Sequence, residues 1–238
     1  MDDLLFRIQD VMSSPITILL LTLGAYLLGE KLFVRSGNKG WFHPVLVGSV
    51  LVYMVIRFTS IDIEVYTEHS TVLKTLLAPF TVALAIPLSR QLYHVRELAG
   101  PIISTLVLGA VLVILIGLGM AWVSGAERDV LMSISTKGVT TAVALALSEK
   151  MGAIVPLAVA VVCLSGIYGG LVGPWICKKT GITDVRAVGF SLGINAHAGG
   201  TAMAFGINPT MGVYSSLAMC LNAILTPLAL PFVITLIL

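Results

Sequence analysis

Six long runs of apolar residues dominate this chain of 238 residues. Each run approaches or exceeds the ~20 residues that an α-helix needs to cross the hydrocarbon core of a bilayer. They cover roughly residues 15–33, 44–59, 71–89, 101–123, 154–177 and 213–238. Only 11% of the residues are charged and the net charge is +2, which argues against a soluble enzyme and against a nucleic-acid-binding protein. The sequence therefore predicts an all-α polytopic membrane protein.

Charges between the runs predict the orientation of the chain, because Lys and Arg concentrate on the cytoplasmic side of a membrane. Three loops are marked by Lys31, Arg35 and Lys39, by Arg90 and Arg96, and by Lys178, Lys179 and Arg186. If these loops are cytoplasmic, the fourth run ends outside. The run 154–177 supplies one crossing back to the cytoplasmic loop at Lys178, so the stretch 129–150 must return to the side from which it entered. Its second half, 139–150, is too short to span the core. We expect a re-entrant hairpin here; a broken helix that spans is the alternative.

A second irregular stretch, 185–206, resembles the first at a constant offset of 60 residues. Residues 134–160 match 194–220 at 8 of 27 positions without a gap, which favours a duplication over two Gly-rich loops that are alike by accident. Each copy combines one hairpin with one spanning helix and therefore crosses the membrane an odd number of times. The second copy is then inverted relative to the first. The sequence thus predicts a four-span region, 1–124, and an inverted-repeat transport region, 125–238, with repeats 125–177 and 185–238.

The two hairpin tips are suited to bind an anion. At each tip a second half-helix begins, and its N-terminus offers free N–H groups and a partial positive charge. Lys137 and His197 stand at matching positions, and an ionisable residue at membrane depth is a functional-site candidate. The predicted substrate-binding residues are Lys137, Thr140, Thr141, Asn195, His197, Gly199, Gly200, Thr201 and Asn222.

Several of these residues also allow a purely structural interpretation. Lys137 could extend to the membrane surface, and His197 could be a neutral, hydrogen-bonded packing residue. Asn222 could reach substrate or make an interhelical hydrogen bond. Pro79 and Pro87 in the third run either free carbonyls that line the same cavity or only kink a helix.

Acidic residues are missing from the middle of every run, which argues against a cation channel or pump. The nearest approach to a nucleophile with a base is Ser165 with His197, and it lacks the surrounding signature of an intramembrane protease. We therefore expect no enzymatic activity, no metal and no cofactor.

Three segments carry a recognisable pattern: LLAPFTVALAIPLSRQLYHVR, STKGVTTAVALALS, and GINAHAGGTAMAF followed by YSSLAMCLNAILTPLALP. In order and spacing they resemble the LrgB/CidB family over roughly residues 15–238. The chain departs from the usual form of that family at Thr136, Gly138, Ala142 and Met203. The last position usually holds an arginine, so the binding of a carboxylate is left to Lys137 and His197.

This resemblance implies two competing functions. Bacterial members are described as holin-like or antiholin-like proteins that influence murein hydrolase activity and cell lysis, beside a small LrgA/CidA-like membrane partner. Plastid relatives exchange glycolate and glycerate, and some bacterial systems take up pyruvate or related acids. We predict a multi-pass protein of the inner membrane that forms a homodimer, by analogy with the family, and carries small monocarboxylates or hydroxycarboxylates by alternating access. Control of lysis is the alternative.

Overall fold

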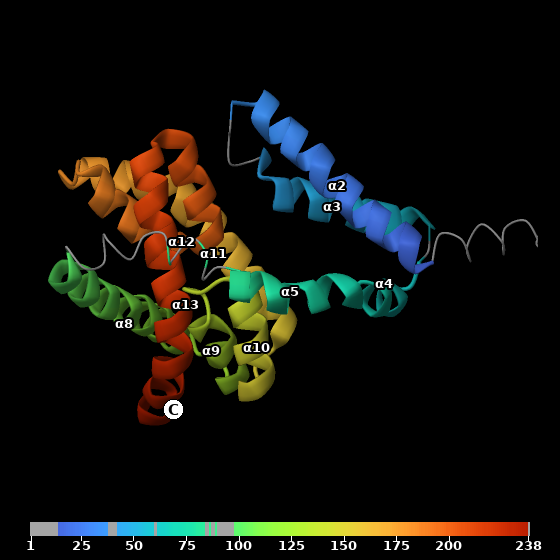
Figure 1. Ribbon diagram of the computed structural model, residues 1–238. Helices are drawn as coiled ribbons and strands as arrows, with labels where there is room; N and C mark the ends of the chain where they lie inside the picture. Colours follow the sequence, from blue (N-terminus) through green and yellow to red (C-terminus); the bar gives the residue numbers. More distant parts are fainter. Residues whose placement is uncertain are drawn as a thin grey trace, which may run out of the picture. The chain divides into compact units, whose positions relative to one another are not determined.

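The computed structural model describes residues 14–37, 42–59, 61–83, 86, 89 and 98–237, and within these ranges every regular element is a helix (Figure 1). The chain divides into two compact units, Met1–Phe80 and Thr81–Leu238. The predicted all-helical fold is confirmed for the described residues. Helix α8 (Ala99–Val123), which the sequence analysis assigns to the N-terminal region, lies in the second unit.

The first unit contains α2 (Pro15–Arg35), α3 (Pro44–Thr59) and α4 (Ile63–His69), and α5 (Thr71–Ala83) begins in it. Ser14 caps α2 by accepting a hydrogen bond from the Thr17 N–H, and proline occupies the first helical position, where no N–H is needed. Helices α2 and α3 approach closely because Gly29 lies directly against the Pro44 backbone. The rest of the third apolar run, with Pro87, Arg90 and Arg96, lies outside the described residues.

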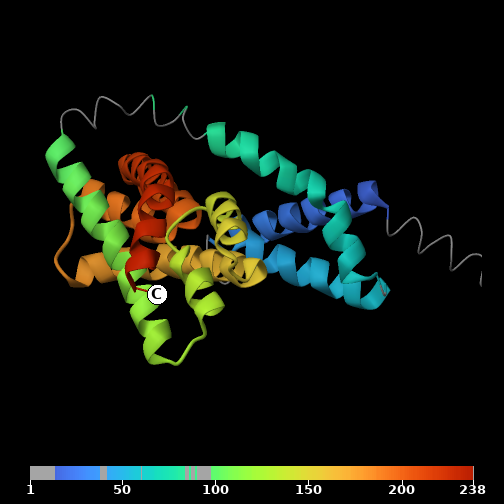
Figure 2. The ribbon, with the colours of Figure 1, turned by 90° about the horizontal axis from the view of Figure 1, so that it is seen from below.

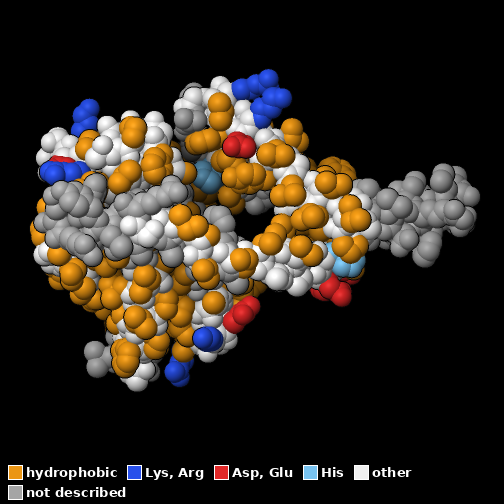
Figure 3. Space-filling view, viewed as in Figure 1, with side chains coloured by type: hydrophobic (Ala, Val, Ile, Leu, Met, Phe, Trp, Pro, Cys, Tyr) orange, Lys and Arg blue, Asp and Glu red, His pale blue; other side chains and the backbone are white. Residues whose placement is uncertain are grey.

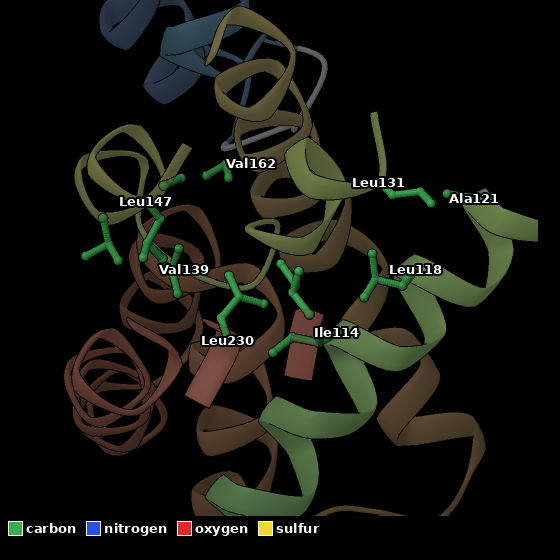
Figure 4. Packing of buried hydrophobic residues seen from close by; sticks show 11 residues of the cluster. Ile114, Leu118, Ala121, Leu131, Val139, Leu147, Val162 and Leu230 are labelled. Atoms are coloured by element: carbon green, nitrogen blue, oxygen red, sulfur yellow. The ribbon is translucent and has the colours of Figure 1, made fainter. Parts of the chain in front are cut away.

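The second unit contains α8, α9 (Arg128–Ser135), α10 (Thr141–Met151), α11 (Val155–Lys179), α12 (Val185–Ile207) and α13 (Pro209–Ile237). Helix α13 packs along α12 and also contacts α8 and α10 (Figures 1 and 2). The largest apolar cluster joins five of these elements, with Ile114 and Leu118 facing Leu131, and with Leu147 and Leu230 on the other helices (Figure 4). This core supports the two helix breaks described below.

Four described helices are long and apolar enough to cross a membrane: Pro15–Arg35, Ala99–Val123, Val155–Lys179 and Pro209–Thr235. On α8, Leu108, Leu112, Ile116 and Met120 recur every fourth residue and are each more than half exposed. Hydrophobic side chains likewise dominate the visible surface of both units (Figure 3). Apolar surface this extensive requires lipid around it. The protein is therefore a membrane protein. Helix α3, of 16 residues, is shorter than the four long helices, and the count of six spans stays a prediction.

The second unit contains two helix breaks. Between α9 and α10 the chain turns through residues 136–140, where the Lys137 N–H donates to Ile134 O and the Val139 N–H to Thr136 O. Helix α12 is interrupted at a single residue, His197, with φ 35° and ψ −124°.

Beyond His197 the chain doubles back on itself. A Cβ placed on Gly200 would lie 3.0 Å from the carbonyl oxygen of Leu192. In a straight helix these residues, eight apart, would be separated by a rise of about 12 Å. Both breaks are therefore followed by a short helical segment and then by a long helix, α11 or α13. The two segments share this order of elements, and the inverted repeat stays a prediction.

Candidate substrate-binding site

The first break presents Lys137 on the turn between α9 and α10. Its aliphatic stem lies along α8, where a Cβ on Gly117 would come within 2.7 Å of Lys137 Cε. The side chain is half-buried. In the described part of the chain the one ion pair joins Arg186 to Asp184, so the Lys137 ammonium has no carboxylate partner there. A half-buried cation without a counter-ion is suited to hold an anion.

Thr140 is the second polar residue at this break whose side chain has no partner among the described residues. It occupies the N-cap position of α10, and its side chain is only 8% exposed. Its Oγ1 has no hydrogen-bond partner among the described residues, although an unpaired buried hydroxyl costs about 1–3 kcal/mol. The first N–H groups of α10 also lack intrahelical acceptors, as at any helix N-terminus. The Thr140 hydroxyl and these N–H groups are therefore polar groups without partners at the start of α10, on the turn that also carries Lys137.

The second break buries His197, which is 4% exposed. Gly166 of α11 makes the room for the ring, since a Cβ there would lie 2.8 Å from His197 Cε1. The positive φ of His197 is one that glycine adopts freely and that other residues adopt at a cost of about 1–3 kcal/mol. A residue other than glycine in such a strained backbone conformation is a candidate for function.

The two breaks meet at Ser165 of α11. The Ser165 hydroxyl can donate to the carbonyl oxygen of Lys137 at 3.0 Å, and it lies 3.4 Å from His197 Nε2. The structure therefore brings the two matched residues to one serine. The contact to Lys137 is through its backbone carbonyl, whereas its side chain runs toward Gly117.

Asn222 anchors the first break from α13. Its amide is buried, donates to the carbonyl oxygen of Gly138 at 2.7 Å, and accepts from Thr226 at 3.0 Å. The interhelical hydrogen bond that the sequence analysis weighed for Asn222 is therefore present. It fixes the turn that carries Lys137.

The other predicted binding residues surround the breaks without forming one cluster. Thr201 is buried and its hydroxyl pairs with Ser215 at 2.9 Å, whereas the Thr141 hydroxyl faces the Cys163 thiol. Asn195 is exposed, and its amide donates to Ser191 O within its own helix. The remaining two, Gly199 and Gly200, allow close backbone contact with α11 and with the first half of α12.

Sequence reasoning missed Gly117 and Gly166, and it considered Ser165 only for catalysis. Glycine and serine on spanning helices generally mark close helix contacts, and that signal identifies candidates. It does not select these three from the many small residues in the apolar runs.

The fold and these breaks define an α-helical integral membrane protein that gathers polar groups inside an apolar bundle. The model of the LrgB-like family matches residues 22–236, so this chain belongs to that family. This confirms the resemblance found in the sequence.

Relatives align along almost the whole chain. Protein YxaC of Bacillus subtilis is 31% identical over 219 residues, which are 92% of this chain and 95% of YxaC. Holin-like protein CidB of Staphylococcus epidermidis is 24% identical over 221 residues, 93% of this chain and 96% of CidB. Antiholin-like protein LrgB of Bacillus cereus is 26% identical over 219 residues, 90% of this chain and 95% of LrgB. No solved structure matches the chain.

Proposed function

We propose that this protein carries small monocarboxylates or hydroxycarboxylates, such as glycolate, glycerate or pyruvate, across the membrane by alternating access. One observation carries the proposal: among the described residues, the first helix break has a half-buried ammonium, Lys137, without a carboxylate partner and a buried hydroxyl, Thr140, without a hydrogen-bond partner. Thr140 caps α10, whose first N–H groups also lack intrahelical acceptors. A carboxylate would supply a partner to each of these groups.

The energetics favour a small anion over other cargo. A carboxylate that leaves water needs charge-assisted hydrogen bonds to offset its desolvation. Lys137 and the N-terminus of α10 would provide them, and His197 at the second break would add a group that can gain a proton. In the described part of the second unit, Asp and Glu occur only near helix ends and in loops, so a cation would find no counter-charge at the breaks.

We further propose that both breaks are the tips of opposed re-entrant hairpins in a protein of six spans. Helices α9 and α10 have 8 and 11 residues, or about 12 and 16 Å, against a hydrocarbon core of ~30 Å. This length argues for entry from one side and return to it. A membrane-impermeant thiol reagent should label cysteines at Glu127 and Glu149 from outside and at Lys178 from the cytoplasm only. Labelling of Glu149Cys from the cytoplasm would contradict the inverted repeat.

Localisation and assembly complete the proposal. We place the protein in the inner membrane as a homodimer, beside a small LrgA/CidA-like membrane protein as a possible partner. Catalysis is not part of it: the Ser165 hydroxyl is directed at backbone carbonyls, and no described carboxylate contacts His197. A nucleophile activated by an oriented base needs the opposite arrangement.

The second candidate function is the control of murein hydrolase activity and lysis. The names of the relatives favour it, since one is holin-like and another is antiholin-like. A holin forms lesions in the membrane and has no need for a binding site.

Uptake by purified protein in liposomes separates the two functions. We expect saturable uptake of labelled glycolate, glycerate or pyruvate that unlabelled short acids inhibit, while an unrelated dye is retained. Each measurement should be made with and without an LrgA/CidA-like partner. Leakage of the dye together with non-saturable entry of every acid would favour the holin-like function instead.

A further inference from the structure

Ser165 joins the two helix breaks through a single hydroxyl group. It projects from α11, lies 3.0 Å from the Lys137 carbonyl oxygen of the first break, and lies 3.4 Å from His197 Nε2 of the second. Among the described residues, no other side chain hydrogen-bonds to both Lys137 and His197. The position of one break is therefore linked to that of the other through this residue.

The single proton of the hydroxyl determines which way these bonds run. The carbonyl oxygens of Lys137 and Val162, 3.0 and 2.9 Å away, can only accept, so the Ser165 proton is directed at one or both of them. The lone pairs of Oγ then face His197 Nε2. Two acceptors cannot face each other favourably, so this arrangement, in which the shorter bonds run to the carbonyls, favours an Nε2 that carries a proton and donates to Oγ.

We propose that Ser165 is a positioning residue that holds the two breaks together and selects the Nε2–H form of His197, which leaves Nδ1 for the cargo. This inference rests on the proposed function. Gly166 lies against the same ring: a Cβ there would come 2.8 Å from Cε1 and 3.4 Å from Nδ1 and would crowd that edge of the imidazole. A neutral Nδ1 accepts a hydrogen bond from a cargo hydroxyl, and a protonated one donates to a carboxylate.

Two measurements test this role on the full chain in lipid. The first is the KM and Vmax of glycolate uptake in liposomes for Ser165→Ala and Ser165→Thr, with Ser104→Ala as control. Ser104 also bonds a carbonyl of its own helix but is exposed on α8. We expect Ser165→Ala to raise KM about three- to tenfold, as for the loss of one hydrogen bond, and Ser165→Thr to restore it. Ser104→Ala should leave KM unchanged.

The second measurement reads the imidazole itself and does not depend on transport. Solid-state NMR of ¹⁵N-histidine-labelled protein identifies the His197 signals by their loss in His197→Gln. The wild type should show the Nε2–H form, Ser165→Ala a mixture of both forms, and Ser165→Thr the wild-type pattern.

The outcomes separate this inference from the proposed function. Saturable uptake with an Nδ1–H histidine, or with the same KM and NMR signals in Ser165→Ala, would overturn the role of Ser165 and leave transport standing. Absence of saturable uptake by the wild type would overturn transport, while the NMR comparison still decides the tautomer. Should Ser165→Ala not fold, the wild-type tautomer and the KM of Ser165→Thr give the decision.

Discussion

The two helix breaks occupy matching positions in the sequence but differ in whether their polar side chains have hydrogen-bond or ion-pair partners. The first is a turn of five residues, 136–140, where Lys137 has no carboxylate partner and the buried Thr140 hydroxyl no hydrogen-bond partner among the described residues. The second is a single residue, His197, whose ring contacts Ser165, and the neighbouring Thr201 is paired with Ser215. Unmatched polar groups inside an apolar bundle are costly and imply a ligand, whereas matched ones imply a scaffold. Under the proposed function, the first break would bind the charge of the cargo and the second would orient it.

The largest expected effect is that of removing the charge at the first break. Lys137→Ala deletes a charge-assisted bond worth about 1.5–3 kcal/mol, so uptake per unit of membrane protein should fall at least tenfold. Lys150→Ala is the matched control, since Lys150 is exposed in the last turn of α10. Uptake of labelled glycolate in liposomes measures both. Uptake that persists in Lys137→Ala combined with His197→Ala, at normal membrane levels, would contradict the site.

Replacing the residue at the second break separates strain from function. At φ 35° glycine is relaxed whereas alanine is strained, so His197→Gly should be more stable than His197→Ala by about 1 kcal/mol. Both variants should lose uptake, because both lack the ring. Thermal unfolding in detergent measures the stability difference. Equal stability of the two variants would show that the backbone at this position is not strained.

Thr140 at the first break and Thr201 at the second give the sharpest contrast between the breaks. Thr140→Val removes a hydroxyl that has no partner among the described residues, so the fold should be as stable as the wild type or more so, while the affinity for cargo falls about two- to tenfold. Thr201→Val removes the bond to Ser215 and should destabilise the fold by about 1 kcal/mol. Unfolding and uptake of the two variants are measured side by side. A loss of stability in Thr140→Val would mean that its hydroxyl is already satisfied.

The smallest effect concerns the start of α12, which leads to the second break. Asp184 caps this helix, and its hydrogen bonds from the Arg186 side chain and backbone lower its pKa to about 2. Since this pKa lies below the ordinary value of 3.8, the contribution to stability is present above pH 4 and is lost as the pH falls toward 2. The unfolding temperature of Asp184→Ala should be slightly below that of the wild type at pH 6, and the difference should shrink as the pH falls to 2. A difference as large at pH 2 as at pH 6 would argue against the carboxylate as its cause.

The long apolar helices were predicted closely from the sequence. The run 15–33 became α2, Pro15–Arg35, and the run 154–177 became α11, Val155–Lys179. Both helix breaks were located as well, because Gly, Ser and Thr interrupt the apolar pattern around Lys137 and His197. These features depend on neighbours along the chain, which the sequence displays directly.

The sequence by itself determined that this is a helical membrane protein with two breaks in its helices, each holding one residue able to carry positive charge. Only the tertiary structure decided that Ser165 touches both breaks, that Gly117 accommodates Lys137, and that among the described residues Thr140 lacks a partner where Thr201 has one. The reason is physical: apolar periodicity and helix-breaking residues act locally, whereas the partner of a buried polar group depends on which helices pack together. The sequence shows where small residues lie on the spanning helices, but only the packing of the helices shows which neighbour each of them contacts.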